Sequence, residues 1–302
     1  MIQSKNVKAR LFFTYLKDKT ELFLHVKPRG TIGSRSVYRR APGDAAMGLR
    51  IDALLDTVGV LKSELEIWVL LYPPEIRTTT IYAPSDLTDD EIDGYIHETV
   101  LSNQPYLINY DWNNYLLKRR DNGQGEDMVT ISFIGKRVLP RIKALLHRDA
   151  SKINFIGDGL QFLTVDENEF PQLRGQTYEL ILPYDEMYFK TIIRSGIHFE
   201  SLGLPHGCSS EFGHYKLEAE QAYLKVNHDM SKLDLPLFQP LVPKSLWKET
   251  LLTPAAFPCW YIASKSMTQM EQANFAQLFH AEENPLSQRE QKMVHPDYHF
   301  YT

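Results

Sequence analysis

The sequence predicts an α/β protein made of two halves with the same βββαβα order, with a small subdomain inserted into the first half. Residues 7–40 and 178–204 each contain three runs rich in Val, Ile, Leu, Phe and Tyr, separated by short polar turns. This pattern is typical of a three-strand meander. Segments with helical spacing and apolar strands follow each meander. Because one repeated unit accounts for both copies, an internal duplication is the simplest interpretation.

The first half is expected to span residues 1–165. After its meander, the apolar pattern predicts a helix at Ala45–Val58 and strands at 65–73 (LEIWVLLYP) and 77–84 (RTTTIYAP). Further along, it predicts a strand at 128–134 (MVTISFI), a helix at 136–147 and a strand at 152–157 (KINFIG). Strands that alternate with helices in this way indicate a mixed α/β sheet.

The inserted subdomain is expected at about residues 85–120. Thr88 followed three residues later by Glu91 predicts a capping box at the start of a helix. Ile92, Tyr95 and Ile96 give that helix an apolar face. Two short strands, at 106–112 (YLINYDW) and 114–120 (NYLLKRR), are expected to follow.

The second half is expected to span residues 166–280. After its meander, the sequence predicts helices at 209–226 and 242–252, a strand at 257–264 and a helix at 267–279. Residues 281–302 form a polar tail that ends in the aromatic residues Tyr298, Phe300 and Tyr301. Because a solvated tail gains nothing from such a composition, we expect these side chains to dock, either on a partner or on this chain.

Composition narrows the functional classes. The formal charge of −5 argues against nucleic acid as a partner, because phosphate binding needs a positive field. The two basic clusters, Arg29–Arg40 and Lys118–Arg120, are interpreted as charged strand edges, with phosphate binding as the alternative. No apolar run reaches the ~20 residues that span a bilayer, and the N-terminal segment lacks a signal-peptide pattern. We therefore expect a cytoplasmic protein.

The sequence offers no clear catalytic constellation. It contains no P-loop, and Gly157 and Gly159 form a lone G-x-G that is interpreted as a turn. Cys208 lies near His206 without an identifiable third member, and the histidines lack metal-ligand spacing. The first turns of the two meanders, 16–20 and 183–187, carry Asp, Glu or Pro where a phosphate loop needs small residues. We expect no catalytic residue, no cofactor and no metal.

The duplicated meander resembles the actin/hexokinase-type fold, which shares its strand meander with RNase H-like proteins. The stretch LEIWVLLYPPEIRTTTIYAPSDLTDDEIDGYIHETV is similar to a segment of the actin-like PilM proteins of type IV pilus machines and of the cytoplasmic part of the type II secretion L-component. MVTISFI and YFKTIIRSGIHFESLGLP match the return strand and the second-half hairpin of those proteins, so the resemblance covers roughly Leu65–Ala263. It implies duplicated actin/RNase H-like halves, here with a degenerate nucleotide site because the Asp-x-Gly phosphate elements are missing.

This resemblance implies a non-catalytic cytoplasmic scaffold of a membrane-associated secretion or pilus assembly, peripheral at the inner membrane through its partners. The partners would be other subunits of the machine, with no nucleic acid and no direct membrane contact. The inserted subdomain and the tail are the expected contact regions, through Tyr106, Tyr110, Trp112, Tyr298, Phe300 and Tyr301. A degenerate actin-fold ATPase and an RNase H-like nuclease are the alternatives.

Overall fold

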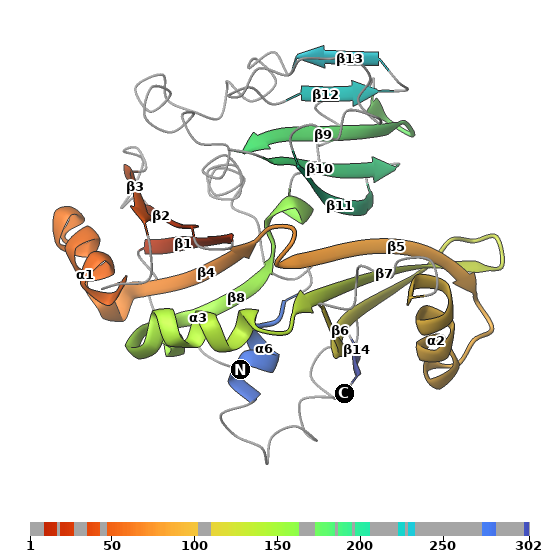
Figure 1. Cartoon of the computed structure of the whole chain (residues 1–302), viewed down its shortest axis with the longest axis horizontal. Coiled ribbons are helices and arrows are strands. Elements are labelled where there is room, and N and C mark those ends of the chain that lie inside the picture. Colours follow the sequence, from red (N-terminus) through yellow and green to blue (C-terminus); the bar gives the residue numbers. More distant parts are fainter. Residues whose placement is uncertain are drawn as a thin grey trace.

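A computed structural model gives the architecture of the chain (Figure 1). It describes residues 9–16, 19–26, 35–42, 47–101, 110–162, 173–184, 187–194, 197–205, 223–226, 229–232, 274–281 and 299–301. Their strands form two sheets, a five-stranded sheet in the order β3-β2-β1-β4-β8 and a nine-stranded sheet in the order β13-β12-β9-β10-β11-β5-β7-β6-β14. The two meanders therefore belong to different sheets, as two separate halves require.

The five-stranded sheet contains the first meander. Its strands are β1 (Ala9–Leu16), β2 (Lys19–Val26), β3 (Arg35–Pro42), β4 (Leu65–Leu71) and β8 (Ile153–Asp158). β1, β2 and β3 pair antiparallel, whereas β4 pairs parallel with both β1 and β8. An antiparallel meander followed by two parallel strands is the order of an actin/RNase H-like half. The expected fold class is thus confirmed for the first half, while the duplication itself stays a prediction.

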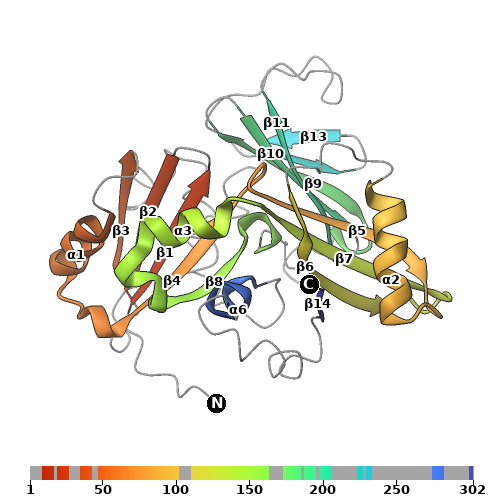
Figure 2. The same cartoon turned by 60° about the horizontal axis from the view of Figure 1, so that its bottom comes forward.

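Both faces of the central strands of this sheet are buried. On one face the apolar side chains of α1 (Met47–Val58), α3 (Val138–Leu146) and α6 (Ala276–Ala281) pack with those of the strands in one cluster (Figure 2). On the other face Trp68 is the centre of an aromatic group, with Phe155, Phe12 and Phe162 at ring-centroid distances of 5.2, 6.0 and 5.9 Å. Burial on both faces explains why β4 is apolar at nearly every position.

The nine-stranded sheet joins the inserted segment to the second meander. From the first half it takes β5 (Ile76–Pro84), β6 (Tyr110–Asp121) and β7 (Glu126–Gly135). The second meander supplies β9 (Thr177–Tyr184), β10 (Met187–Arg194) and β11 (Ile197–Pro205). The remaining strands are β12 (Tyr223–Val226), β13 (Asp229–Lys232) and β14 (His299–Tyr301). β11 and β5 meet through the single pair Glu200 and Thr79, so the two parts of the sheet are joined at one point.

Helix α2 (Asp89–Ile96) covers the outer part of this sheet and ends in a π turn, His97–Leu101. The expected capping box is present: the Thr88 hydroxyl accepts the Glu91 N–H, and the Glu91 carboxylate accepts the Thr88 N–H at 2.9 Å. Ile92 and Ile96 are fully buried against β5, β6 and β7 in a second apolar cluster. The cap therefore fixes where the helix begins, and its apolar face fixes where it packs.

Two expectations about secondary structure are wrong. Residues 110–121 form one strand, β6, instead of parts of two, and a register shift between Tyr110 and Tyr115 lies within it. The helix expected at 209–226 is contradicted at Tyr223–Val226, which pair with β9 as strand β12. Of the helix expected at 267–279, the described residues show α6 from Ala276, and residues 267–273 lie outside the described residues. The rest of 209–222, and the elements expected at 242–252 and 257–264, lie outside the described residues.

Candidate functional site

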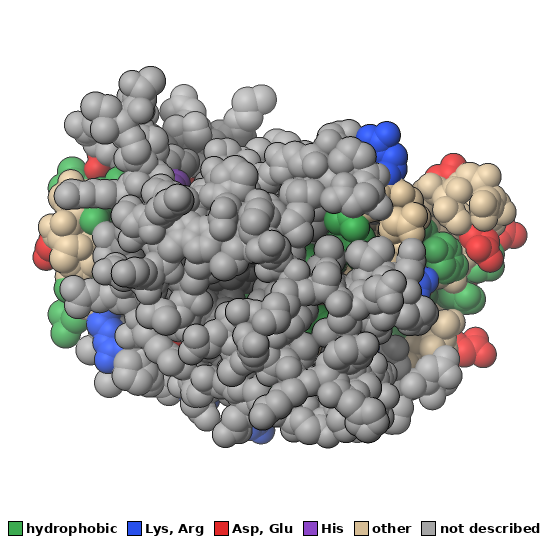
Figure 3. Space-filling view, turned by 90° about the horizontal axis from the view of Figure 1, so that it is seen from above, with side chains coloured by type: hydrophobic (Ala, Val, Ile, Leu, Met, Phe, Trp, Pro, Cys, Tyr) green, Lys and Arg blue, Asp and Glu red, His purple; other side chains and the backbone are tan. Residues whose placement is uncertain are grey.

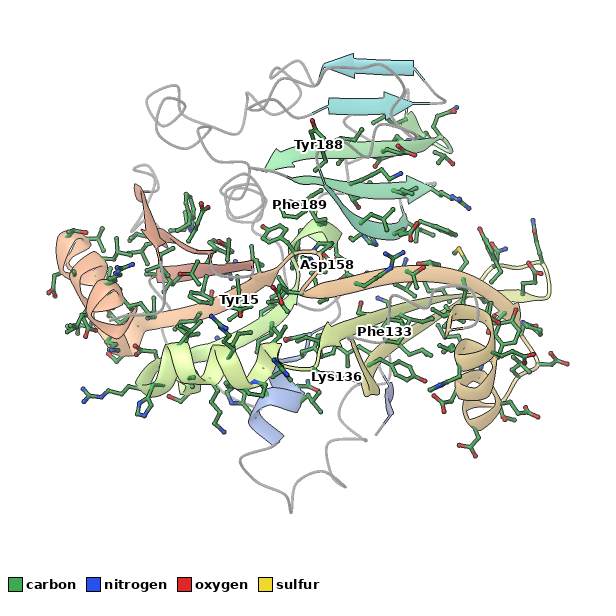
Figure 4. All side chains as sticks on the ribbon, viewed as in Figure 1. Tyr15, Phe133, Lys136, Asp158, Tyr188 and Phe189 are labelled. Atoms are coloured by element: carbon green, nitrogen blue, oxygen red, sulfur yellow. The ribbon has the colours of Figure 1, made fainter. Side chains whose placement is uncertain are left out.

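Two regions are candidates for function: a buried polar cluster where the two sheets meet, and the outer edge of the nine-stranded sheet. The polar cluster begins at Asp158, the last residue of β8 (Figure 4). The chain then turns through a short 3-10 segment, Gly159–Phe162, which contributes Gln161. Thr78 of β5, Ser132 of β7 and Ser201 of β11 complete the cluster, so four strands and a turn supply its side chains.

Hydrogen bonds connect these groups. The Asp158 carboxylate accepts the Leu160 N–H at 2.8 Å. The Gln161 side-chain amide lies 3.3 Å from the hydroxyl oxygens of both Thr78 and Ser132, and these two oxygens are 3.1 Å apart. The network is only partly satisfied, because the buried atoms Asp158 Oδ2, Gln161 Oε1 and His198 Nδ1 make no hydrogen bond with the described part of the chain. The cluster thus joins the end of the five-stranded sheet to both parts of the nine-stranded sheet.

Burial shifts two pKa values in opposite directions. It raises the pKa of the Asp158 carboxyl from 3.8 to about 6, although hydrogen bonds from Ser201, Leu160 and Thr78 act to lower it. Burial lowers the pKa of the His198 imidazole to about 3. His198 Nε2 lies 2.8 Å from the Ser201 hydroxyl, so Ser201 lies between the two titratable groups. His198 is therefore neutral at physiological pH, and the Asp158 carboxyl titrates close to neutral pH.

The cluster is closed to solvent. Asp158 and Ser201 have no exposed surface, and His198, its most exposed member, is 8% exposed. The Tyr72 side chain fills the space beside Gly159, because a Cβ there would lie 2.8 Å from the Tyr72 ring. Tyr72 in turn stacks on Phe189 of β10, with ring centroids 5.1 Å apart. In this arrangement a substrate would have to displace packed aromatic side chains to reach Asp158.

Sequence reasoning considered this segment only as a glycine pair and did not identify Asp158. The G-x-G interpretation as a turn is confirmed, since Gly157 lies in β8 and Gly159 begins the turn. An Asp at the end of a largely buried strand was the available signal. Within the described ranges, no three His, Cys, Asp or Glu side chains are grouped so that they could hold a metal ion. Cys208, Cys259 and His206 lie outside those ranges.

The second region is the outer edge of β6, where the tail returns to the molecule. β14 pairs antiparallel with β6, so that His299 is opposite Leu117, Phe300 opposite Leu116 and Tyr301 opposite Tyr115. Figure 1 shows this short strand beside β6 near the C-terminus. The backbone of the tail strand therefore pairs with this chain, whereas the docking of its aromatic side chains stays a prediction.

The structure brings together residues that the sequence indicated separately. Tyr110 and Trp112 lie on β6, and Phe300 and Tyr301 lie on β14, so the two predicted contact regions are adjacent strands of one sheet. Tyr106 and Tyr298 lie outside the described residues. Whether these aromatic residues bind a partner stays a prediction.

The basic cluster Lys118–Arg120 also lies on β6. Arg119 makes an ion pair with Asp127 of β7, and it donates to the carbonyl oxygens of Leu87 at 2.7 Å and Ser85 at 2.9 Å. Its guanidinium therefore ties the loop before α2 to the sheet, which makes phosphate binding by this side chain costly. In the other basic cluster, Arg35–Arg40 lie on β3 and Arg29 lies outside the described residues.

No protein-family model and no curated protein matches the chain. Among solved structures it is similar to the cytoplasmic domain of EpsL, an inner-membrane component of the type II secretion system of Vibrio cholerae. The identity is 11% and the TM-score 0.44, over 69% of this chain and 76% of that one. A PilM–PilN type IV pilus biogenesis complex matches at 12% identity and a TM-score of 0.46, over 96% of this chain and 79% of that one.

A third similar structure is a Bacteroides thetaiotaomicron protein of unknown function with an actin-like ATPase fold. It has 10% identity and a TM-score of 0.39, over 70% of this chain and 76% of that one. All three TM-scores lie below 0.5, so the fold class rests on the strand order of the five-stranded sheet.

Proposed function

We propose that this chain is a non-catalytic scaffold that works by protein–protein interaction in a membrane-associated bacterial secretion or type IV pilus assembly. The closed polar junction carries the proposal. Its groups are at most 8% exposed, whereas an active site needs reactive groups that a substrate can reach. The junction between the sheets is therefore built to hold the molecule together.

The proposed membership of a secretion or pilus machine rests on the sequence resemblance described above, which extends from the strand at 65–73 to the second-half hairpin. Location in the cytoplasm, at the inner membrane through partners, is part of the same proposal. In the described part of the chain, no helix is both long and apolar enough to cross a bilayer.

Surface charge supports a protein partner over nucleic acid. Acidic side chains gather at the α2 end of the molecule (Figure 3). Those of Asp86, Asp90, Glu91, Asp121 and Glu126 are all exposed there. Such an end would repel the phosphate backbone of a nucleic acid.

Two measurements on the native protein test the proposal. Affinity purification of the tagged chain from its own cells, with mass spectrometry, should recover subunits of one secretion or pilus machine. Millimolar Mg-ATP should leave the melting temperature unchanged and should not be hydrolysed. A nucleotide bound at 100 times its dissociation constant would instead stabilise the fold by about 2.7 kcal/mol. That stabilisation, or hydrolysis above background, would favour the actin-fold ATPase alternative.

A further inference from the structure

We propose that Asn122 is a site of spontaneous deamidation, and that the Asp121 carboxylate slows this reaction in the folded chain. The sequence contains a single Asn-Gly pair, Asn122–Gly123, and it lies in the turn between β6 and β7. The inference concerns a covalent change of this turn and does not rest on the proposed scaffold role.

The reaction needs only the groups of the turn itself and water. The Gly123 backbone nitrogen loses its proton and attacks Cγ of the Asn122 side chain, which closes a five-membered succinimide ring. The bond between Cγ and the side-chain nitrogen breaks, and that nitrogen leaves with the proton as ammonia. Water then opens the ring at either of its carbonyl carbons, so the product is aspartate or isoaspartate. No group is oxidised or reduced.

The first observation is that the turn is open to this reaction. Gly123, Gln124 and Gly125 are exposed, and Asn122 is half-buried. The Asn122 side chain makes no hydrogen bond to the described part of the chain. Gly123 has a φ of 70°, and no atom lies within 4 Å of the position that a Cβ would take there. Because glycine has no Cβ, nothing on residue 123 crowds the approach of its nitrogen to Cγ.

The second observation is a hydrogen bond that restrains the attacking nitrogen. The Gly123 N–H donates to Oδ1 of Asp121 at 2.6 Å. Attack requires this nitrogen to lose its proton, and the nearby carboxylate repels the negative charge that then develops on the nitrogen. A hydrogen bond to a charged group that must break before the reaction slows it by about tenfold. Asp121 therefore protects the amide of the residue that follows it.

Deamidation would alter a turn that is bonded to the loop before α2. The Asn122 N–H donates to the carbonyl oxygen of Glu126 at 3.1 Å. The Gly125 carbonyl oxygen accepts the Ser85 N–H at 3.2 Å and the Ser85 hydroxyl at 3.0 Å. Isoaspartate lengthens the backbone of this turn by a methylene group and so disturbs these bonds. Both products also add a negative charge beside Asp121, at the acidic end of the molecule (Figure 3).

The test follows Asn122 in the purified full-length chain during incubation at neutral pH. Mass spectrometry of the tryptic peptide 121–136 measures the conversion of amide to acid, and chromatography separates the aspartate and isoaspartate forms. Asp121→Ala removes the acceptor of the Gly123 N–H. Glu126→Ala is the matched control, because it removes another exposed carboxylate from the same turn. Asn122→Gln is the blank, since its longer side chain does not form the five-membered ring.

Amide hydrogen exchange, measured by NMR, shows whether Asp121→Ala acts on one N–H or unfolds the turn. The Gly123 N–H should exchange about tenfold faster in the variant, because the same proton leaves the same nitrogen. The Asn122 N–H, which is bonded to Glu126, should keep its protection. If it does not, Asp121→Ser replaces Asp121→Ala, because serine removes the charge but still favours turns.

We expect the wild-type chain to form isoaspartate and aspartate at position 122, and the Asp121 variant with an intact turn to form them about tenfold faster. Glu126→Ala should react at the wild-type rate, and Asn122→Gln should not react. The inference is overturned if the Asp121 variant reacts no faster than wild type, if neither chain reacts, or if aspartate is the only product. Equal acceleration by Glu126→Ala would also overturn it. These results do not depend on a partner, so the inference and the proposed function can fail separately.

Discussion

At the scale of single residues, Gly159 shows how tightly the junction between the sheets is packed. An added methyl group would lie 2.8 Å from the Tyr72 ring, which is itself held by Phe189. We expect Gly159→Ala to lower the free energy of unfolding by about 1–3 kcal/mol, the usual cost of overpacking. Urea denaturation measures it.

Gly94 is the matched control for this substitution. It lies in α2 with no atom within 4 Å of an added Cβ. Gly94→Ala should therefore stabilise the chain by roughly 0.5–1 kcal/mol, from helix propensity alone. Equal effects at the two glycines would show that Tyr72 does not close the junction.

Asp158 and His198 predict a second effect, on the pH dependence of stability. Between pH 3.8 and about 6 the native Asp158 keeps a proton that the unfolded chain has lost, so its contribution to stability falls as pH rises. His198 is neutral in the native state down to about pH 3 but ordinarily takes up a proton near pH 6.5, so its contribution rises with pH. The two contributions cancel between about pH 4 and 6.

Substitution of one residue at a time should separate the opposing contributions of Asp158 and His198 to the pH dependence of stability. In Asp158→Asn the free energy of unfolding should rise from pH 4 to 6, by up to about 1.4 kcal/mol per pH unit relative to wild type. In His198→Gln it should fall by a similar amount over the same range. Urea denaturation at pH 4, 5 and 6 checks both slopes. Two variants with the wild-type slope would show that these groups titrate normally.

At the scale of elements, the contacts of Arg119 connect the loop before α2 to β6 and β7. Its guanidinium group donates to a carboxylate and to two carbonyl oxygens at once. The ammonium group of a lysine cannot reproduce this planar arrangement of donors. Arg119→Lys should therefore lower the free energy of unfolding by about 1–2 kcal/mol. Arg120→Lys, on the next residue, should change it little. Thermal melts of the two variants compare them, and equal losses would contradict the assigned role of Arg119.

The tail strand should also contribute to stability, because it pairs with the molecule that carries it. Deletion of the residues after Pro296 removes β14 and should lower the melting temperature, by roughly 2 °C for each kcal/mol lost. Differential scanning calorimetry of the two chains measures the change. An unchanged melting temperature together with weakened assembly would place the tail on a partner instead.

How much of each element could be predicted depended on how local its signal is. The capping box of α2 was predicted to the residue, because Thr88 and Glu91 meet within one turn. Strand β6 was predicted as two strands, because its continuity across the register shift is set by its pairing with β7, which the local sequence does not show. Strand β12 was predicted as helix, since the tertiary pairing of Tyr223–Val226 with β9 outweighs local propensity. The polar cluster was missed because its hydrogen-bonded members Thr78, Ser132 and Gln161 lie 29 to 83 residues apart in the sequence.

At the scale of the whole molecule, aromatic packing links the two sheets, and an ion pair links the two parts of the nine-stranded sheet. Tyr72 stacks on Phe189, and Arg77 of β5 pairs with Glu200 of β11 at 2.5 Å. The backbone link between β5 and β11 is a single residue pair. Side chains therefore carry the connection, and they should make both sheets unfold as one cooperative unit.

The pair Tyr72 and Phe189 tests this cooperativity. Calorimetry should show one transition for the wild-type chain. A double-mutant cycle with Tyr72→Leu and Phe189→Leu should give a coupling free energy of about 0.5–1.5 kcal/mol, because each substitution alone removes the same ring contact. Tyr82 and Phe199 are the control pair, since their rings lie 6.1 Å apart between β5 and β11 but Tyr82 is 40% exposed. The control cycle should give a smaller coupling. If wild type melted in two steps, or if the exposed pair coupled as strongly as the buried one, the junction would not be what holds the halves together.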